Sequence, residues 1–103
     1  MVKKALIVAI NAYPSPYVLK NSLNDCNALV TSLKKRGFTA VTIIKDSAAT
    51  KSAIVNALNL LVTNAKSKDS ICFAFFGHGS YITSTTEPDG RTECICPVDV
   101  ISK

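Results

Sequence analysis

The order in which two kinds of hydrophobic pattern follow one another constrains this chain more than any other feature. Continuous apolar runs at residues 5–10 and 71–76, and a run rich in β-branched residues at 40–44, have the length of strands and lack the alternation of a half-exposed sheet. Between them, residues 22–36 and 51–65 place apolar side chains at three- and four-residue steps, the spacing of an amphipathic helix. The pattern predicts strand, helix, strand, helix, strand, an α/β fold with a parallel sheet and right-handed crossovers.

Local signals fix the ends of these elements and the edge at which a site would form. Gly37 is a stop signal for the first helix, and Thr50 is placed to cap the second. If the third strand pairs with the first, the strand order is 2-1-3 and the helices cover opposite faces. In such sheets, sites form beyond the carboxyl ends of the strands. Residues 11–25 and the segment from Gly77 onward both leave from that edge, so we expect them to be neighbours.

Composition narrows the classes of function. At 103 residues, with 48% apolar and 18% charged residues, the chain has room for one small domain and is too apolar to be disordered. The net charge is +5, but the lysines are scattered and do not alternate with aromatic residues, so we expect no nucleic-acid partner. The apolar run near the N-terminus is too short for a signal peptide or a membrane span. We therefore expect a cytoplasmic protein without a membrane partner.

Four cysteines raise the questions of disulfides, metal binding and catalysis. Without a secretory signal, disulfides are not expected. Cys94 and Cys96 together with His78 could be imagined as zinc ligands, but their spacing matches no familiar zinc module. Cys26 has helical core spacing and Cys72 lies within an apolar run, so both are predicted to be small buried hydrophobes.

His78, the one histidine of the chain, lies at the carboxyl end of the third predicted strand, between Gly77 and Gly79. Glycines on both sides let the backbone turn tightly and leave the imidazole accessible. A histidine in such a place can transfer protons near neutral pH. The alternative is a histidine that occurs in a turn without a catalytic role, but its position after a buried strand favours the functional interpretation.

Four segments follow one another along the chain: ALIVAINAY at 5–13, LKNSLNDC at 19–26, FFGHG at 75–79, and DG at 89–90 followed by ECICPVD at 93–99. Together they resemble the catalytic domain of metacaspases, which are caspase-like cysteine peptidases. The segment 5–13 is similar to the metacaspase opening strand, and 19–26 resembles the metacaspase segment Leu-x-Gly-x-x-Asn-Asp-Ala. The segment 75–79 resembles aromatic-Ser-Gly-His-Gly, and the residues from 89 to 99 resemble the stretch that comes before the next metacaspase segment.

The resemblance implies a caspase-like three-layer α/β/α fold with a mostly parallel sheet. Residues 1–103 would form the N-terminal part of the large-subunit region, with the first three strands and two helices. It also implies cysteine-dependent cleavage of peptide or protein substrates, with His78 and Gly79 as catalytic residues. Asp25 matches the acidic residue that in metacaspases lines the pocket for an arginine or lysine before the scissile bond. Ser22 and Asp25 also fit a variant of the capping box, and the two interpretations are compatible.

Two positions depart from the metacaspase pattern. Phe76 stands where many metacaspases have a pocket serine, so we expect an altered pocket. Thr92 stands where an acidic residue often helps to bind calcium. Other calcium ligands would lie in the C-terminal half of a complete domain, so we expect no metal and no cofactor in this chain.

The position of the nucleophile is the largest departure. In caspases the nucleophilic cysteine follows the histidine by about 50 residues, and this sequence ends at Lys103. We therefore expect no nucleophile in the chain, which would then be a fragment that is inactive alone. The alternative is that Cys94 or Cys96 reaches His78 through a loop that folds back.

The unpaired edge of the predicted sheet indicates which partners to expect. The third strand would have an unpaired edge lined by Phe73, Phe75 and Phe76, where the C-terminal half or a second copy would pair. Two other functions stay open at this point. One is a non-catalytic caspase-like module that binds or regulates other proteins. The other is a small α/β ligand-binding domain, although no glycine-rich phosphate loop follows the first strand.

Overall fold

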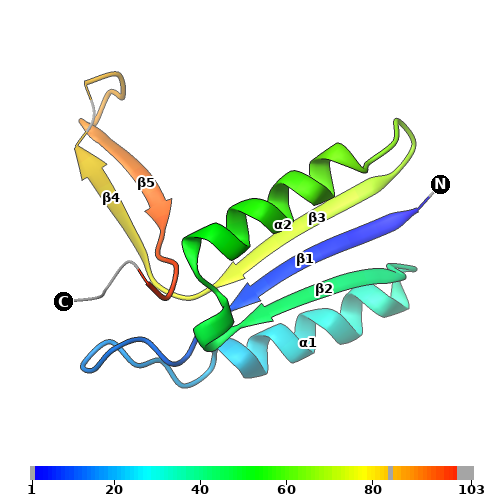
Figure 1. The fold of residues 1–103 in the computed structure, drawn as a ribbon, viewed down its shortest axis with the longest axis horizontal. Coiled ribbons are helices and arrows are strands. Elements are labelled where there is room, and N and C mark those ends of the chain that lie inside the picture. The colour runs from blue at the N-terminus through cyan, green and yellow to red at the C-terminus, as the bar shows by residue number, and fades with distance from the viewer. Residues whose placement is uncertain (1, 84, 100–103) are drawn as a thin grey trace.

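The computed structural model describes residues 2–83 and 85–99, which form a three-layer α/β/α unit with a hairpin at one end (Figure 1). The main sheet has the order β2-β1-β3 with both pairs parallel, which confirms the predicted order 2-1-3. A separate two-stranded sheet pairs β4 with β5 antiparallel. The elements are β1 (Lys3–Ala9), α1 (Ser22–Lys35), β2 (Ala40–Lys45), the 3-10 helix η1 (Asp46–Ala48), α2 (Lys51–Thr63), β3 (Ser70–Phe76), β4 (Gly79–Thr83) and β5 (Arg91–Ile95).

β1 is the central strand, and its side chains alternate between two hydrophobic cores. Ala5, Ile7 and Ala9 belong to one core, while Val8 and the directly following residue Ile10 belong to the other. All five are at most 1% exposed. Full burial of an aliphatic side chain of this kind stabilises a fold by roughly 1.5–3 kcal/mol. Because both faces of β1 are covered, its sequence is apolar without interruption.

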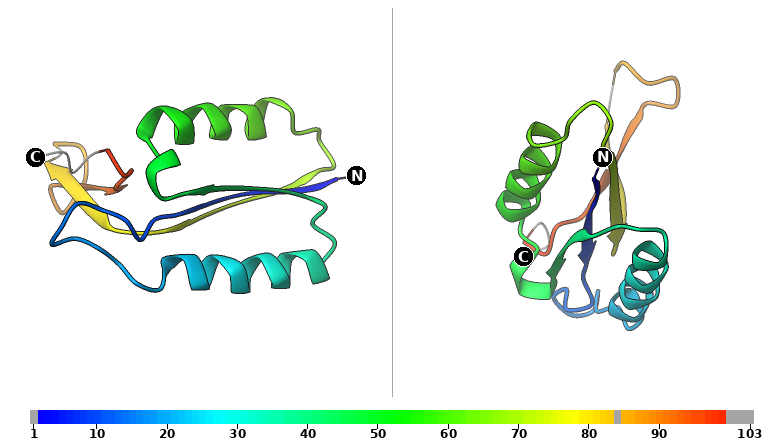
Figure 2. Two further views of the ribbon diagram at one scale, coloured as in Figure 1. Left: turned by 60° about the horizontal axis from the view of Figure 1, so that its bottom comes forward. Right: turned by 90° about the vertical axis from the view of Figure 1, so that its right-hand side faces the viewer.

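The two helices lie on opposite faces of the sheet, as predicted (Figure 2). α1 contributes Cys26 and Leu33 to the core that contains Ile7. α2 contributes Ile54 to the core that contains Val8. The periodic spacing of the apolar residues in each helix therefore corresponds to the face that is buried.

Both predicted helix-end signals are present. Gly37 has φ 91, a left-handed conformation that favours glycine, and the N–H of Phe38 donates to the carbonyl of Leu33 at 3.0 Å. At the start of α2, the Thr50 hydroxyl accepts a hydrogen bond from the Ala53 N–H at 3.2 Å.

The hairpin that follows β3 differs from the expectation. The resemblance implied three strands and two helices for this chain, but the structure has two more strands: β4 begins at Gly79 and β5 ends at Ile95. The two strands are short and project beyond the end of the main sheet (Figure 1). They lack a continuous apolar run because they are not sandwiched between helices, so the pattern that revealed β1 to β3 could not reveal them.

The edge strand β3 also corrects one prediction. Within residues 2–83 and 85–99, β3 pairs only with β1, so its other edge has no strand partner. All three phenylalanines belong to this edge strand, but Phe75 and Phe76 are half-buried and pack against the opposite cores beneath α2 and α1. Of the three, only Phe73 is exposed, at 39%. Successive side chains of a strand point to opposite faces, so the phenylalanines do not form one apolar surface along the edge.

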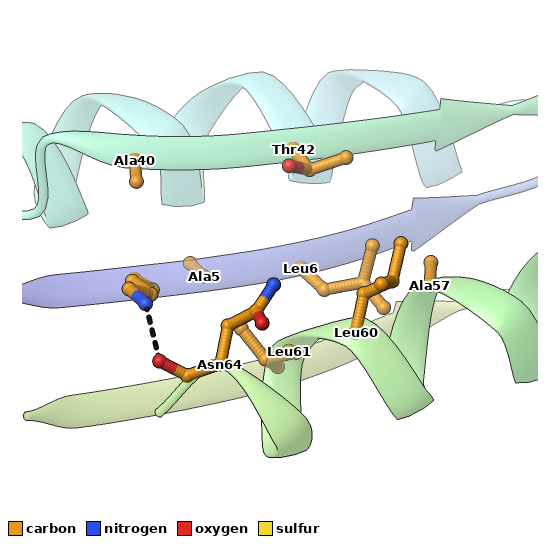
Figure 3. A pocket seen from close by; sticks show the side chains of 9 residues that line it. Ala5, Leu6, Ala40, Thr42, Ala57, Leu60, Leu61 and Asn64 are labelled. Atoms are coloured by element: carbon orange, nitrogen blue, oxygen red, sulfur yellow. Dashed lines mark hydrogen bonds between the residues drawn. The ribbon is translucent and has the colours of Figure 1, made fainter. Parts of the chain in front are cut away.

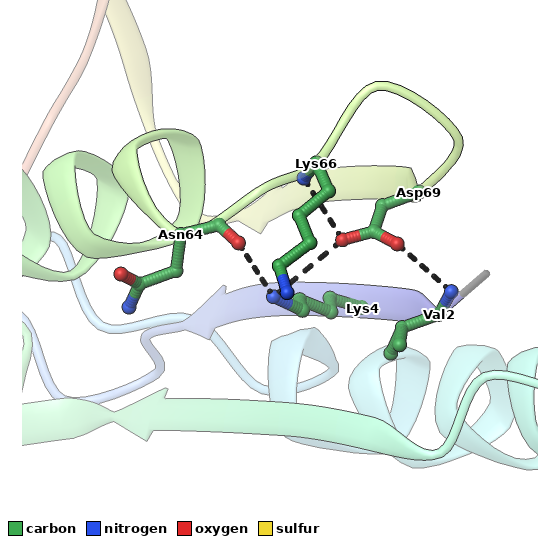
Figure 4. A network of polar contacts seen from close by, with 5 residues as sticks. All are labelled: Val2, Lys4, Asn64, Lys66 and Asp69. Carbon is green, nitrogen blue, oxygen red and sulfur yellow. Dashed lines mark hydrogen bonds and ion pairs between the residues drawn. The ribbon is translucent and has the colours of Figure 1, made fainter.

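At the amino ends of β1 and β3, Asp69 fixes the loop between α2 and β3 (Figure 4). Its carboxylate accepts the backbone N–H of Val2 at 2.9 Å and that of Lys66 at 3.0 Å, and lies 3.8 Å from the Lys4 ammonium. These backbone hydrogen bonds hold the pKa of the Asp69 carboxyl below its usual value.

A groove of about 210 Å³ lies between α2 and the strands β1 and β2 (Figure 3). It is lined mainly by aliphatic side chains and reaches the first residues of β1 and β2, away from the edge where His78 lies. The residues that line it are Lys4, Ala5, Leu6, Ala40, Thr42, Ala57, Leu60, Leu61 and Asn64. No helix in the described part of the chain is long and apolar enough to cross a membrane.

Candidate functional site

His78 lies in the turn between β3 and β4, beyond the carboxyl end of β3. Its imidazole Nε2 is 2.7 Å from the backbone oxygen of Tyr17, which belongs to the loop that follows β1. The prediction that the segments after the first and third strands are neighbours is therefore confirmed by a direct hydrogen bond. The imidazole is half-buried.

The partner of Nε2 determines which nitrogen can accept a proton. A carbonyl oxygen only accepts hydrogen bonds, so Nε2 of His78 must carry a hydrogen when it bonds to Tyr17. In the neutral imidazole, Nδ1 is then the unprotonated nitrogen. A backbone carbonyl that orients the base in this way leaves the other ring nitrogen available for proton transfer.

Tyr13 lies against the same turn. Its hydroxyl accepts the His78 N–H at 3.0 Å and donates to the Cys96 carbonyl at 2.7 Å, while the Cys96 N–H donates to the His78 carbonyl at 2.9 Å. The ring centroids of Tyr13 and His78 are 4.8 Å apart. Tyr13 is only 2% exposed, and burial raises the pKa of its phenol above the usual value. The hydroxyl therefore stays protonated near neutral pH.

The two glycines beside His78 differ in how much room the structure leaves for a side chain. A Cβ atom on Gly77 would collide with the Tyr13 hydroxyl and come within 2.8 Å of the Phe75 ring, so this position has no room for a side chain. A Cβ atom on Gly79 would meet only the Cys94 carbonyl, at an ordinary 3.6 Å. Neither glycine has a positive φ. Close packing therefore requires Gly77, whereas the fold alone does not require Gly79.

The loop after β1 is anchored to the end of β2 by Asp46. Its carboxylate accepts the N–H groups of Asn11 at 2.9 Å and Ala12 at 3.1 Å. The Asn11 side chain accepts the Ser22 N–H at 2.9 Å, and the Asn11 carbonyl accepts the Leu19 N–H at 2.8 Å. Asp46 and Asn11 thus hold the loop that presents the Tyr17 carbonyl to His78.

Asp25 lies in the first turn of α1 and is exposed. Within residues 2–83 and 85–99, its carboxylate has no hydrogen bond or ion pair. The capping-box interpretation is wrong, because Asn21 is the N-cap and makes no side-chain cap bond, and Asn11 satisfies the Ser22 N–H instead. α1 begins at the carboxyl edge of the main sheet (Figure 1), the edge beyond which β3 leads into His78.

The four cysteines occupy different environments. Cys26 and Cys96 are buried, and burial raises the pKa of both thiols, which disfavours the reactive thiolate. Cys72 is half-buried within β3, so the prediction of a fully buried side chain holds for Cys26 alone. Cys94 is exposed and lines a groove of about 470 Å³ between α2 and β5.

The described part of the chain contains no cluster of side chains that could bind a metal ion. No three His, Cys, Asp or Glu side chains lie close enough together there to hold an ion. Thr92, the position discussed for calcium, instead donates its hydroxyl to the Glu87 carboxylate at 3.3 Å. Phe76 packs against the core beneath α1, on the same side of the sheet as Asp25.

Some residues that build the site were not singled out from the sequence. Tyr13 and Asn11 were noted only as parts of the opening strand, and Asp46 was not noted at all. Asp46 directly follows β2, so its place at the carboxyl edge of the sheet was the signal that could have found it. Asp99 was noted only within a segment, yet its carboxylate accepts the Lys51 N–H at 3.0 Å at the start of α2.

Comparison with known proteins gives one consistent result. The model of the family described as "Metacaspase, peptidase C14 domain" matches residues 3–103. Metacaspase-1 of Yarrowia lipolytica is 36% identical over 108 residues, which cover 94% of this chain and 23% of that protein. Metacaspase-3 of Arabidopsis thaliana is 32% identical over 108 residues, which cover 94% of this chain and 30% of that protein. The chain thus spans about a quarter to a third of the length of these relatives.

A solved structure supports the fold independently. The crystal structure of a protein from Geobacter sulfurreducens superposes with a TM-score of 0.79 at 25% identity. The match covers 95% of this chain and 40% of that chain. The predicted fold class, a caspase-like α/β unit with a parallel sheet between two helices, is therefore confirmed.

Proposed function

The chain belongs to the metacaspase, peptidase C14 family, and from this membership we propose that it supplies the catalytic histidine of a cysteine endopeptidase. The observation that supports this role is the 2.7 Å hydrogen bond from His78 Nε2 to the Tyr17 carbonyl. It leaves Nδ1 of His78 as the proton acceptor, at the sheet edge where α/β folds place their sites.

In the proposed reaction, Nδ1 of His78 accepts the proton of a cysteine thiol. The thiolate attacks the carbonyl carbon of the scissile peptide bond, and the protonated imidazole then gives its proton to the leaving amine. Water subsequently hydrolyses the acyl-enzyme and regenerates the thiol. Gly79 lies next to the imidazole and is exposed, so the absence of a side chain there leaves room for the substrate backbone.

Asp25 is our proposed determinant of specificity. An exposed carboxylate without a partner in the described residues attracts the guanidinium or ammonium group of a substrate side chain. The substrate class is therefore a peptide with arginine or lysine before the scissile bond. Phe76 packs beneath α1 in place of the small polar residue expected in the pocket, so the pocket shape differs from that of many relatives.

The nucleophile is proposed to come from outside these 103 residues. Cys26 and Cys96 are buried with raised pKa values, and Cys72 is held within β3. Cys94 is exposed, but it faces the groove beside α2, whereas the His78 ring lies between Tyr13 and Tyr17. We therefore propose that the chain alone does not hydrolyse peptides. The segment that bears the nucleophile, or a second copy, would pair with the outer edge of β3.

The test is an assay with fluorogenic peptides that end in arginine or lysine, with aspartate-terminated peptides as the specificity control. The purified chain is assayed first, together with its intact mass and association state. The longest native form that includes the nucleophile is assayed next, as wild type, His78→Ala and Asp25→Asn. The proposal expects no turnover by the chain alone, and turnover by the longer form that His78→Ala abolishes.

Three other outcomes would each contradict part of the proposal. Thiol-sensitive turnover by the chain alone, lost in Cys94→Ala or Cys96→Ala, would place the nucleophile within these residues. Full preference for arginine and lysine in Asp25→Asn would remove Asp25 from the specificity pocket. No turnover by the longer form would instead favour the non-catalytic module that binds or regulates other proteins.

A further inference from the structure

We infer that the Tyr13 hydroxyl is a positioning group for His78: it fixes the backbone of the turn that presents the imidazole. This inference rests on the proposed function for its catalytic meaning, but the geometry behind it is independent of any activity. The Tyr13 hydroxyl contacts the backbone groups of His78 and Cys96, so it would act through His78.

A closed ring of three hydrogen bonds supports the inference. The His78 N–H donates to the Tyr13 hydroxyl at 3.0 Å, that hydroxyl donates to the Cys96 carbonyl at 2.7 Å, and the Cys96 N–H donates to the His78 carbonyl at 2.9 Å. The hydroxyl uses its hydrogen and a lone pair at once, and both main-chain groups of His78 are satisfied by this ring. Because Tyr13 is 2% exposed, water cannot readily replace it.

The sequence of the turn is fitted to this hydroxyl. A side chain at Gly77 would collide with it, so the hydroxyl occupies the space that any other residue at this position would need. Gly77 therefore serves the approach of Tyr13 to the His78 backbone. This explains one glycine of the Gly-His-Gly segment by packing and leaves Gly79 to the substrate.

The aromatic side chain of Tyr13 and the loop to which it belongs also hold His78 in place. The aromatic ring packs against the imidazole at a centroid distance of 4.8 Å. The loop from Tyr13 to Tyr17 is braced by a hydrogen bond from the Tyr17 N–H to the Pro14 carbonyl at 2.9 Å. One short loop thus holds His78 twice, through the Tyr13 hydroxyl at the backbone and through the Tyr17 carbonyl at Nε2. Releasing the first contact should loosen the second.

NMR of His78 tests the inference without any activity, because the chain has a single histidine. In the wild type, the His78 amide should exchange with solvent more slowly than an unprotected amide. In Tyr13→Phe, which keeps the ring, it should exchange about tenfold faster or more, since one buried hydrogen bond is lost. The imidazole ¹⁵N signals should also move toward those of a mixture of the two neutral tautomers. Tyr81→Phe, which removes an exposed hydroxyl from β4, is the matched control and should change neither signal.

The failure of this inference can be told apart from the failure of the proposed function. A folded Tyr13→Phe protein with wild-type exchange and wild-type ¹⁵N signals would overturn the positioning role. If Tyr13→Phe does not fold, the wild-type measurement decides, because an unprotected His78 amide would overturn the role by itself. In a form that carries the proposed nucleophile and turns over peptides, Tyr13→Phe should lower kcat by roughly tenfold to a hundredfold with little change in KM. Full activity of His78→Ala would reject the proposed function and leave the NMR result standing.

Discussion

Nε2 of His78 lies 2.7 Å from the backbone oxygen of Tyr17, although 61 positions separate the two residues along the chain. The contact joins the loop after β1 to the turn after β3 at the carboxyl edge of the sheet. A main-chain carbonyl cannot lose its acceptor character through substitution or through a change of pH. The orientation of the imidazole is therefore set by the backbone of the loop.

This contact predicts the tautomer of the free imidazole. In its neutral form, His78 should carry its hydrogen mainly on Nε2, because only that tautomer can donate to the Tyr17 carbonyl. Long-range ¹H–¹⁵N correlation spectra distinguish the two neutral forms. The same chain unfolded in urea supplies the reference for an unconstrained histidine. A folded protein whose histidine carries its hydrogen mainly on Nδ1 would contradict the assigned contact.

Asp46 is predicted to stabilise the loop after β1. Asp46→Ala removes the acceptor of two backbone N–H groups, those of Asn11 and Ala12. A hydrogen bond typically contributes about 0.5–1.5 kcal/mol net, so loss of the two should lower the free energy of unfolding by roughly 1–3 kcal/mol. Urea denaturation measures this change. Asp25→Ala is the control, because its exposed carboxylate has no partner in the described residues and should alter the unfolding free energy by less than about 0.5 kcal/mol.

Where a strand is sandwiched between helices, the sequence alone was sufficient to predict it. β1 is covered on both faces, so its apolar run was unbroken, and the helices that cover it showed helical spacing. β4 and β5 form a two-stranded hairpin outside the main sheet, and half-exposed short strands leave no comparable pattern. The unpaired edge of β3 was predicted, but the burial of Phe75 and Phe76 was not, because they pack against cores on opposite faces of the sheet.

Of the candidate site, the sequence allowed His78 to be predicted but not the groups that contact it. His78 could be located because it follows an easily recognised strand. The partners of His78 could not be derived, since the Tyr17 contact is made by a backbone oxygen, which is present in every residue. Asp46 supports the loop by accepting the backbone N–H groups of Asn11 and Ala12, and no local sequence pattern indicates a contact between these distant segments.

The reactivity of the thiols should follow their burial. Cys94 is exposed, while burial raises the pKa of Cys26 and Cys96 and so lowers their thiolate fraction at any given pH. In the folded protein near pH 7.5, a thiol reagent should modify Cys94 first. Mass spectrometry of peptides identifies the modified residue, and Cys94→Ser should remove the fast phase. Equal rates at all four cysteines in the folded state would contradict the burial described here, whereas equal rates in guanidinium chloride are expected.

Removal of the N-cap of α2 is predicted to cause a moderate loss of stability. Thr50→Ala removes the hydroxyl that accepts the Ala53 N–H, and loss of such a cap typically costs about 0.5–2 kcal/mol. Thr50→Ser keeps the hydroxyl and should recover most of the loss. Chemical denaturation of the three proteins measures the difference. If Thr50→Ser were as unstable as Thr50→Ala, packing of the Thr50 methyl group would be the cause and the cap would not matter.

Asp69 should make the stability of the fold sensitive to acid in a defined direction. Its carboxylate accepts the N–H groups of Val2 and Lys66, and these hydrogen bonds hold its pKa below the usual value of 3.8. A carboxyl whose folded pKa is lowered stabilises the fold fully at a pH above its unfolded pKa. That contribution is lost as the pH falls through the folded pKa. The wild type should therefore unfold at a higher temperature than Asp69→Asn at pH 7, and the difference should close as the pH falls below 3.8.

Thermal unfolding followed by circular dichroism between pH 7 and pH 2 measures this difference. The comparison of two proteins at each pH removes the general destabilisation by acid, which affects both. Glu93→Gln, at an exposed position of β5, is the control and should track the wild type at every pH. A difference between wild type and Asp69→Asn that stays constant down to pH 2 would show that the carboxylate charge is not what holds the loop, because an uncharged carboxyl would then serve equally well.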